Sequence, residues 1–199
     1  MSTSRRSPQQ ERGERRVAQL LEAAGAEMAE VGYEATTMTA IAERAGASIG
    51  TLYQYFPDKD AVAVALRAQY VAEFEECWAA LEGRGAKLNL RRLADLIVDT
   101  IVDYIARRPA YLPLMTTLRN HKRDHGARNR LREHIAALFR GRRPELTKED
   151  ALRMANVTVQ TLKGMNPLFV DATEPEKEAI VREFKMLLFG YLSVRLKAH

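Results

Sequence analysis

The sequence has one cysteine among 199 residues and no apolar run that approaches the length of a membrane span. The single cysteine, Cys77, excludes an internal disulfide and fits a reducing cytoplasm; beside Trp78, it is expected in the core. The longest apolar run, "MLLFGYL" over residues 186–192, is much shorter than the ~20 residues that a membrane helix needs. The polar N-terminus has no apolar segment after its arginines, so no secretory signal is expected. These absences predict a cytoplasmic protein without a membrane partner.

Signatures of catalysis and of metal binding are also scarce. The sequence has no glycine-rich phosphate loop and no nucleophile–base pair with local support, which predicts a protein that is not an enzyme, has no catalytic residue and needs no cofactor. The segment "HKRDH" over residues 121–125 has two histidines four residues apart, with Asp124 beside them. It lacks the HExxH spacing and stands among arginines that repel cations, so no metal site is expected.

Positive charge is distributed unevenly along a chain whose net charge is +5. Residues 1–60 have a net charge of −2, and their positive charge is concentrated in an N-terminal tail. Most of the excess lies in Arg119–Arg143, where nine residues are basic and two are acidic. Two interpretations of that stretch stay open, a site for an anionic effector and a solvated face. The tail contains Arg5, Arg6, Arg12, Arg15 and Arg16.

Apolar residues recur with helical spacing, and no convincing alternation of apolar and polar residues predicts a strand. The pattern therefore favours an all-α fold of about nine helices. A compact three-helix unit is expected up to about Phe56, joined by a long fourth helix to a larger helical body. The expected helices span about residues 14–31, two short segments between 37 and 56, 59–81, 90–107, 110–121, 127–140, 148–165 and 174–197.

The stretch "GASIGTLYQYFPDK" over residues 46–59 has an unusual composition for a short helix. Gly46 and Ala47 form a turn between two short helices, which gives them the dimensions of a helix-turn-helix, and Ser48 is a favourable N-cap for the second. In that motif the second helix lies in the DNA major groove. Gly50 would let the backbone approach the groove, and Gln54 would pair with adenine.

The neighbouring side chains suit the same interface. Ile49 would pack on a thymine methyl group, and Thr51 would hydrogen-bond to a base or a phosphate. Hydroxyl and ammonium groups on the phosphates would fix the register of the protein on the duplex. The residues expected to contact phosphates in this way are Thr37, Thr39, Tyr53, Tyr55 and Lys59.

The segment "TTMTAIAERAGASIGTLYQYFPDKDAV" resembles the DNA-binding segment of the tetracycline-repressor (TetR) family of transcriptional regulators. The resemblance covers about residues 17–64, and beyond them only the helical architecture matches. It implies phosphate contacts at Thr37, Ser48, Tyr53, Tyr55 and Lys59, and positions close to the bases for Ile49, Gly50, Thr51 and Gln54.

Two departures from the family pattern are expected to matter. Ile49 stands where lysine is frequent in the family, so an apolar contact replaces a charged one. Residues 17–60 hold two basic and seven acidic side chains. DNA binding is therefore expected to depend on the arginine tail, although a tail that only confers solubility is the alternative.

The resemblance implies a basic tail at residues 1–13, a DNA-binding domain at 14–58, and an effector-binding and dimerisation domain at 59–199. It implies a repressor that binds a palindromic DNA operator as a homodimer and is released by a small-molecule effector. The alternatives are an activator, an effector-independent regulator, or a helical small-molecule-binding protein or enzyme that does not bind DNA. Residues expected to line an effector pocket, or else to form ordinary core, are Phe74, Trp78, Tyr104, Tyr111, Met115 and Asn156.

The last helix is apolar almost all round from Phe184 to Leu192, and such a helix must be covered on more than one side. A twofold homodimer would cover it, with Gly190 and Ser193 allowing close approach, although burial within one chain is the alternative. The expected interface residues are Met154, Thr158, Thr161, Phe184, Leu188 and Tyr191.

Overall fold

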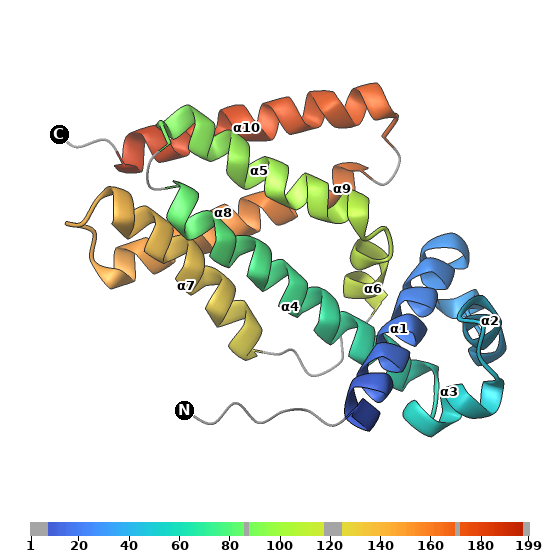
Figure 1. Ribbon diagram of the computed structural model, residues 1–199. Coiled ribbons are helices and arrows are strands. Elements are labelled where there is room, and N and C mark those ends of the chain that lie inside the picture. The colour runs from blue at the N-terminus through green and yellow to red at the C-terminus, as the bar shows by residue number, and fades with distance from the viewer. Residues whose placement is uncertain (1–7, 86–87, 118–124, 170–171, 197–199) are drawn as a thin grey trace. The chain divides into compact units, whose positions relative to one another are not determined.

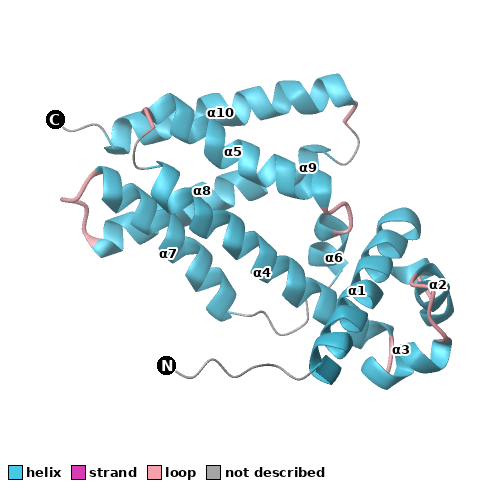
Figure 2. Cartoon of the chain, in the orientation of Figure 1, coloured by secondary structure: helices cyan, strands magenta, loops and turns pink. Residues whose placement is uncertain are grey.

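The computed structural model describes residues 8–85, 88–117, 125–169 and 172–196. The described residues form helices joined by loops and no strand (Figure 2), which confirms the all-α prediction. Among them, the four-residue α9 is the one helix that was not expected. The helices are α1 (Pro8–Ala35), α2 (Met38–Arg44), α3 (Ile49–Tyr55), α4 (Lys59–Gly85), α5 (Leu90–Arg107), α6 (Tyr111–Thr117), α7 (His125–Arg142), α8 (Lys148–Lys163), α9 (Asn166–Phe169) and α10 (Glu174–Leu196) (Figure 1).

The helices are grouped into two compact units. Unit 1 comprises residues 1–70 and 108–122, and unit 2 comprises residues 71–107 and 123–199. The first part of α4 and the short helix α6 therefore pack with the N-terminal helices, whereas the rest of α4 packs in unit 2. The division by packing falls later in the chain than the expected boundary at residue 58, because Val62 and Leu66 of α4 are buried in the core of unit 1.

Helix α1 begins earlier than expected. The predicted tail over residues 1–13 is wrong for residues 8–13, which continue α1 toward the N-terminus, while residues 1–7 lie outside the described residues. Proline is tolerated in the first helical turn, where its missing N–H would have no partner. One turn further on, the Arg15 guanidinium lies 3.3 Å from the Glu11 carboxylate. The two residues are four apart in the sequence, and an ion pair at that separation stabilises a helix. At the other end Gly32, at φ +79°, interrupts the regular helix as predicted.

Short-range hydrogen bonds fix where the next helices begin. The Thr37 hydroxyl accepts from the Ala40 amide at 3.1 Å, so Thr37 is the N-cap of α2. The Asp58 carboxylate accepts from the Ala61 amide at 2.7 Å at the start of α4. Asp58 therefore caps the N-terminus of α4. The core that these helices share consists of Leu20, Leu21, Ala24, Met28, Ile41, Ala42, Leu52, Phe56, Val62, Ala63, Leu66, Tyr70, Ala110 and Leu114.

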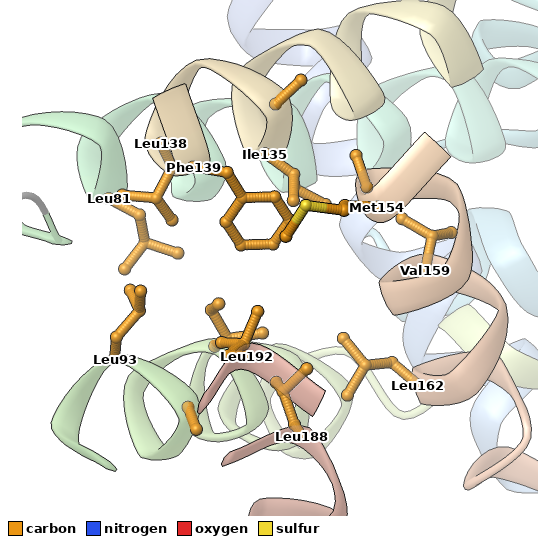
Figure 3. Packing of buried hydrophobic residues seen from close by; sticks show 14 of the residues in the cluster. Leu81, Leu93, Ile135, Leu138, Phe139, Met154, Val159, Leu162, Leu188 and Leu192 are labelled. Carbon is orange, nitrogen blue, oxygen red and sulfur yellow. The ribbon is translucent and has the colours of Figure 1, made fainter. Parts of the chain in front are cut away.

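Unit 2 is organised around two helix pairs, α7 with α8 and α5 with α10. Figure 3 shows Leu188 and Leu192 of α10 meeting Phe139 of α7 and Leu162 of α8 in one apolar core. All four side chains are almost completely buried. None of the described helices is apolar over a length sufficient to cross a membrane.

Part of the basic stretch Arg119–Arg143 has a structural role. The Arg142 guanidinium donates to the carbonyls of Gly85 (3.2 Å) and Leu88, just after α4, and Arg143 donates to the Arg195 carbonyl at 3.0 Å. Such contacts satisfy carbonyl groups that a helix leaves unpaired at its C-terminal end. The interpretation of this stretch as a purely solvated face is therefore wrong for these two arginines. Residues 118–124, which include "HKRD", lie outside the described residues.

Candidate nucleic-acid interface

Helices α2 and α3 are joined by a turn whose geometry depends on one glycine. Gly46 has a φ of +58°, a conformation that favours glycine, and the Ala47 amide donates to the Ala42 carbonyl at 2.9 Å. The Ser48 hydroxyl then accepts from the Thr51 amide at 3.1 Å, which confirms the predicted N-cap of α3. The described turn therefore holds α3 in a helix-turn-helix arrangement.

Helix α3 buries one side and leaves the other open. Leu52 and the C-cap residue Phe56 anchor it in the core of unit 1. On the outer side, Tyr53 is 53% exposed, and a Cβ built at Gly50 has only the Ser48 hydroxyl within 4 Å. Most of the predicted DNA contacts are solvent-exposed in the same way, namely Thr37, Thr39, Ser48, Ile49, Gly50, Tyr53, Gln54 and Tyr55.

Thr51 and Lys59 differ from the other members of the predicted set. Thr51 is half-buried, and its hydroxyl lies 2.8 Å from that of Ser48. The Lys59 ammonium donates to the carbonyls of Tyr33 (2.8 Å) and Glu34 (3.0 Å) near the end of α1. It also lies 4.5 Å from the centre of the Tyr33 ring. Lys59 therefore positions α4 against α1. The predicted phosphate contact of Lys59 would need the third N–H of its ammonium group, and it stays a prediction.

Tyr33 was not singled out from the sequence, although it completes this junction. Its hydroxyl donates to the Asp60 carboxylate, and burial together with that hydrogen bond raises the pKa of Tyr33 to about 12. Tyr33, Lys59 and Asp60 thus tie α1 to the start of α4, which follows α3. Lys59 and Tyr33 are 26 residues apart in the sequence, so helical periodicity could not predict the contact between them.

Arg44, at the end of α2, is also paired within unit 1. Its guanidinium donates to the carboxylates of Glu30 and Glu27, the latter at 2.8 Å. These two hydrogen bonds raise the pKa of Arg44 above its usual value. The pairing fixes α2 against α1 and so contributes to the placement of α3.

The six predicted effector-pocket residues are distributed over both units. Phe74, Trp78 and Tyr104 form an aromatic cluster in unit 2, with ring centroids 6.0 Å apart for Phe74–Trp78 and 5.0 Å apart for Phe74–Tyr104. Asn156 is half-buried on α8 of the same unit. Tyr111 and Met115 lie on α6 in unit 1, so the prediction that all six face one space in the helical body is not supported for these two.

Tyr111 has a packing role that the sequence did not reveal. Its ring meets that of Tyr70 edge-on in unit 1, at a centroid distance of 6.2 Å. Burial raises the pKa of Tyr111 to about 12. The contact joins α6 to the first part of α4.

Of the six buried side-chain polar atoms in unit 2 that have no hydrogen-bond partner among the described residues, two belong to residues that are at most 1% exposed. They are the indole Nε1 of Trp78, which is 1% exposed, and the hydroxyl of Thr158, which is fully buried. Buried polar atoms are normally hydrogen-bonded because desolvation without a partner is costly. Trp78 is therefore an aromatic core residue whose indole donor has no partner in the described part of the chain.

The predicted dimer interface is wrong at three positions. Met154, Thr158 and Leu188 are buried in the core of unit 2 and have no surface to offer a partner. A helix that is apolar all round gives no indication of which side faces its own core, so the prediction included residues that the core buries. The other three predicted interface residues are half-buried, namely Thr161, Phe184 and Tyr191. Cys77, which was expected in the core, is also half-buried. The large apolar side chains that α8 and α10 do expose are Val157, Met186, Leu187 and Val194.

Comparison with known proteins places the whole arrangement in one family. Residues 20–66 match the family model described as bacterial regulatory proteins, tetR family. Residues 89–192, more than half of the chain, match the tetracyclin repressor-like C-terminal domain. The matched regions include α2 and α3 in unit 1 and most of unit 2.

Individual relatives agree with the family match. The HTH-type transcriptional repressor KstR of Rhodococcus jostii (strain RHA1) is 38% identical over 85 residues, which are 43% of this chain and 38% of that protein's length. A TetR-family transcriptional regulator from Streptomyces coelicolor has the same fold with a TM-score of 0.67, 26% identity and coverage of 92% of this chain and 99% of that one.

A second solved structure shows the fold alone. The fatty acid degradation regulator FadR of Bacillus halodurans superposes with a TM-score of 0.63 at 21% identity, over 95% of this chain and 98% of that one. The helix-turn-helix of unit 1, the helical unit 2 and the two family models lead to one conclusion: the chain belongs to the tetR family of bacterial transcriptional regulators.

Proposed function

We propose that the protein is a repressor that binds a palindromic DNA operator as a homodimer and is released from it by a small-molecule effector. The outer side of α3 carries this proposal, because Tyr53, Gln54 and Tyr55 are exposed there beside a glycine with open space around it. The name of KstR, a repressor, favours repression over activation.

The outer side of α3 has the chemistry that reading a major groove requires. Gln54 presents an amide that pairs with the N6 and N7 edge of adenine. The hydroxyls of Tyr53 and Tyr55 suit phosphates on either side of it, and Ile49 offers an apolar surface for a thymine methyl group. Because Leu52 and Phe56 hold α3 from its other side, these groups are presented on a fixed helix.

Selection from a random pool of duplex DNA tests the proposal. The protein should enrich a palindromic site and protect it in a footprint, with an affinity that falls steeply with salt. Half-sites about one helical turn (~34 Å) or a multiple of it apart are expected, since a twofold dimer presents two copies of α3. Failure to enrich any sequence, or binding that is insensitive to salt, would contradict the proposed function.

Substitution of Gln54 by alanine should alter the sequence preference at one base pair of each half-site. The expected loss of discrimination there is roughly 1–3 kcal/mol, because a bidentate amide–adenine pair is removed. Tyr53→Phe is the matched control, since removal of a phosphate contact should weaken all sequences about equally. Competition binding against single-base variants of the selected site measures both effects. An equal weakening of all sites by Gln54→Ala would disprove the base-reading role.

Unit 2 supplies the proposed dimerisation surface. Three large apolar side chains of α10 are exposed, namely Met186 (52%), Leu187 (54%) and Val194 (78%). Leu187 and Val194 are two helical turns apart, and Met186 adjoins Leu187. Gly190 stands between them, and a Cβ built there meets no atom within 4 Å. An exposed apolar stripe with a small residue in its middle suits close packing against a second copy of the same helix. Val157 is the exposed apolar residue that α8 adds.

The effector is proposed to bind in unit 2 beside Phe74, Trp78 and Tyr104. Apolar side chains form the core that contains Trp78, and the Tyr104 hydroxyl donates to the Glu73 carboxylate at 3.4 Å. The unpaired Nε1 of Trp78 is a hydrogen-bond donor, and indole has no acceptor to offer. An uncharged, largely apolar molecule with a carbonyl or ether oxygen would satisfy that donor.

Trp78 is the only tryptophan of the chain, so its fluorescence would report on binding at this position. A panel of neutral apolar ketones and lactones is expected to shift the emission and to release the operator, whereas alkanes of equal size should bind more weakly. Trp78→Phe should reduce the affinity of the oxygen-containing compounds roughly 2- to 12-fold, the value of one neutral hydrogen bond. Operator release by a compound that leaves the emission of Trp78 unchanged would place the effector elsewhere.

A further inference from the structure

DNA binding by unit 1 needs cations that the helix-turn-helix itself does not supply. Residues 17–60 contain two basic and seven acidic side chains. Both basic side chains have internal partners, since Arg44 pairs with Glu27 and Glu30 and Lys59 caps the end of α1. Neutralisation of phosphates is the main source of affinity for DNA, so positive charge must reach the duplex from neighbouring residues.

The N-terminal part of α1 places two arginines on one side of the helix. Arg12 and Arg16 are four residues apart in a continuous helix, and such residues share a face. Glu11 pairs with Arg15, on the adjacent face. The next residue along the face of Arg12 and Arg16 is the neutral Gln19, whose side chain accepts from Arg16 at 3.1 Å. Within the first turns of α1, this face therefore carries two positive charges and no negative charge among the described residues.

Arg16 lies beside the turn that leads into α3. Its Nη2 is 3.5 Å from the Gly46 carbonyl oxygen, and Gly46 precedes the N-cap residue Ser48 by two positions. A guanidinium has five N–H donors in a planar fork, so contacts to Gln19 and to Gly46 leave donors for a phosphate. Any duplex whose major groove receives α3 must bring its backbone past this turn.

We propose that Arg16 is a direct phosphate contact of this protein, and that Arg12 adds to the same positive face one helical turn away. This inference rests on the proposed operator binding. It assigns to helix α1 the role that the sequence suggested for an arginine tail. The binding partner is the DNA backbone irrespective of base sequence.

The test measures how the dissociation constant for the selected operator depends on salt in four proteins: the wild type, Arg16→Gln, Arg16→Lys and Arg92→Gln. Each phosphate contact contributes about 0.9 to the slope of log K against log salt, so a dimer of Arg16→Gln should lose about 2. Its affinity at moderate salt should fall roughly tenfold or more. Loss of a purely structural contact of Arg16 would weaken binding about equally at every salt concentration and so leave the slope unchanged.

The other variants make the result specific. Arg16→Lys should restore most of the slope because it restores the charge. Arg92→Gln removes the same charge from an exposed position on α5 and should bind like the wild type. An unchanged slope for Arg16→Gln, with a wild type that binds the operator, would overturn this inference alone. A wild type that binds no duplex would overturn the proposed function, and this inference with it.

Discussion

Replacement of Gly50 by leucine is expected to weaken operator binding at least about 100-fold while leaving the protein as stable as the wild type, or more so. A Cβ at position 50 meets open space, with only the Ser48 hydroxyl at 3.9 Å, so the fold accommodates a larger side chain. Glycine in a helix is about 1 kcal/mol less favourable than leucine or alanine, so folding alone favours the substitution. Binding should suffer because the side chain would separate α3 from the groove and remove base contacts worth roughly 1–3 kcal/mol each.

Three measurements separate these effects. Denaturant unfolding should give an equal or higher free energy for Gly50→Leu, and Gly50→Ala should bind DNA with intermediate affinity. Ala137→Leu is the matched control, because it adds the same bulk at an exposed position of α7 and should leave binding unchanged. Wild-type affinity in Gly50→Leu would show that the backbone of α3 does not approach the DNA at this point.

Replacement of Leu187 by glutamate is expected to convert the proposed dimer into a monomer at micromolar concentration. Leu187 is 54% exposed on α10, so the charge remains hydrated in an isolated chain and the unfolding free energy of that chain should change little. In a twofold dimer two unpaired carboxylates would be buried, which costs roughly 3 kcal/mol or more and raises the dimer dissociation constant at least about 100-fold. Operator affinity should fall further, because two half-sites could no longer be bound together.

Light scattering and sedimentation on the same samples test the expectation. Val64→Glu serves as the control, since Val64 is an exposed apolar residue of similar accessibility on the part of α4 that belongs to unit 1. A Leu187→Glu protein that remains dimeric would exclude this face of α10 as the interface. The experiment thus tests the exposed side of α10, since Leu188 faces the core instead.

The sequence was sufficient for several features that depend on nearby residues. Helix ends at Thr37, Ser48 and Asp58 are caps whose hydrogen bonds span three residues, so their signals lie within a few letters of one another. The turn at Gly46 was predictable for the same reason, because its positive φ favours glycine. The family, too, was recognisable from the fixed spacing of residues in α2 and α3.

Tertiary structure alone decided what depends on distant residues. Lys59 finds its carbonyl partners 26 residues earlier, and Arg16 reaches a turn 30 residues later, distances at which no periodicity survives. It also decided which side of α10 is exposed, because a helix that is apolar all round has no polar face to fix its rotation. The sequence by itself therefore determined most of the helices, several of their ends and the family, whereas packing determined which side chains face the core and which remain exposed for the proposed contacts with DNA, effector and partner.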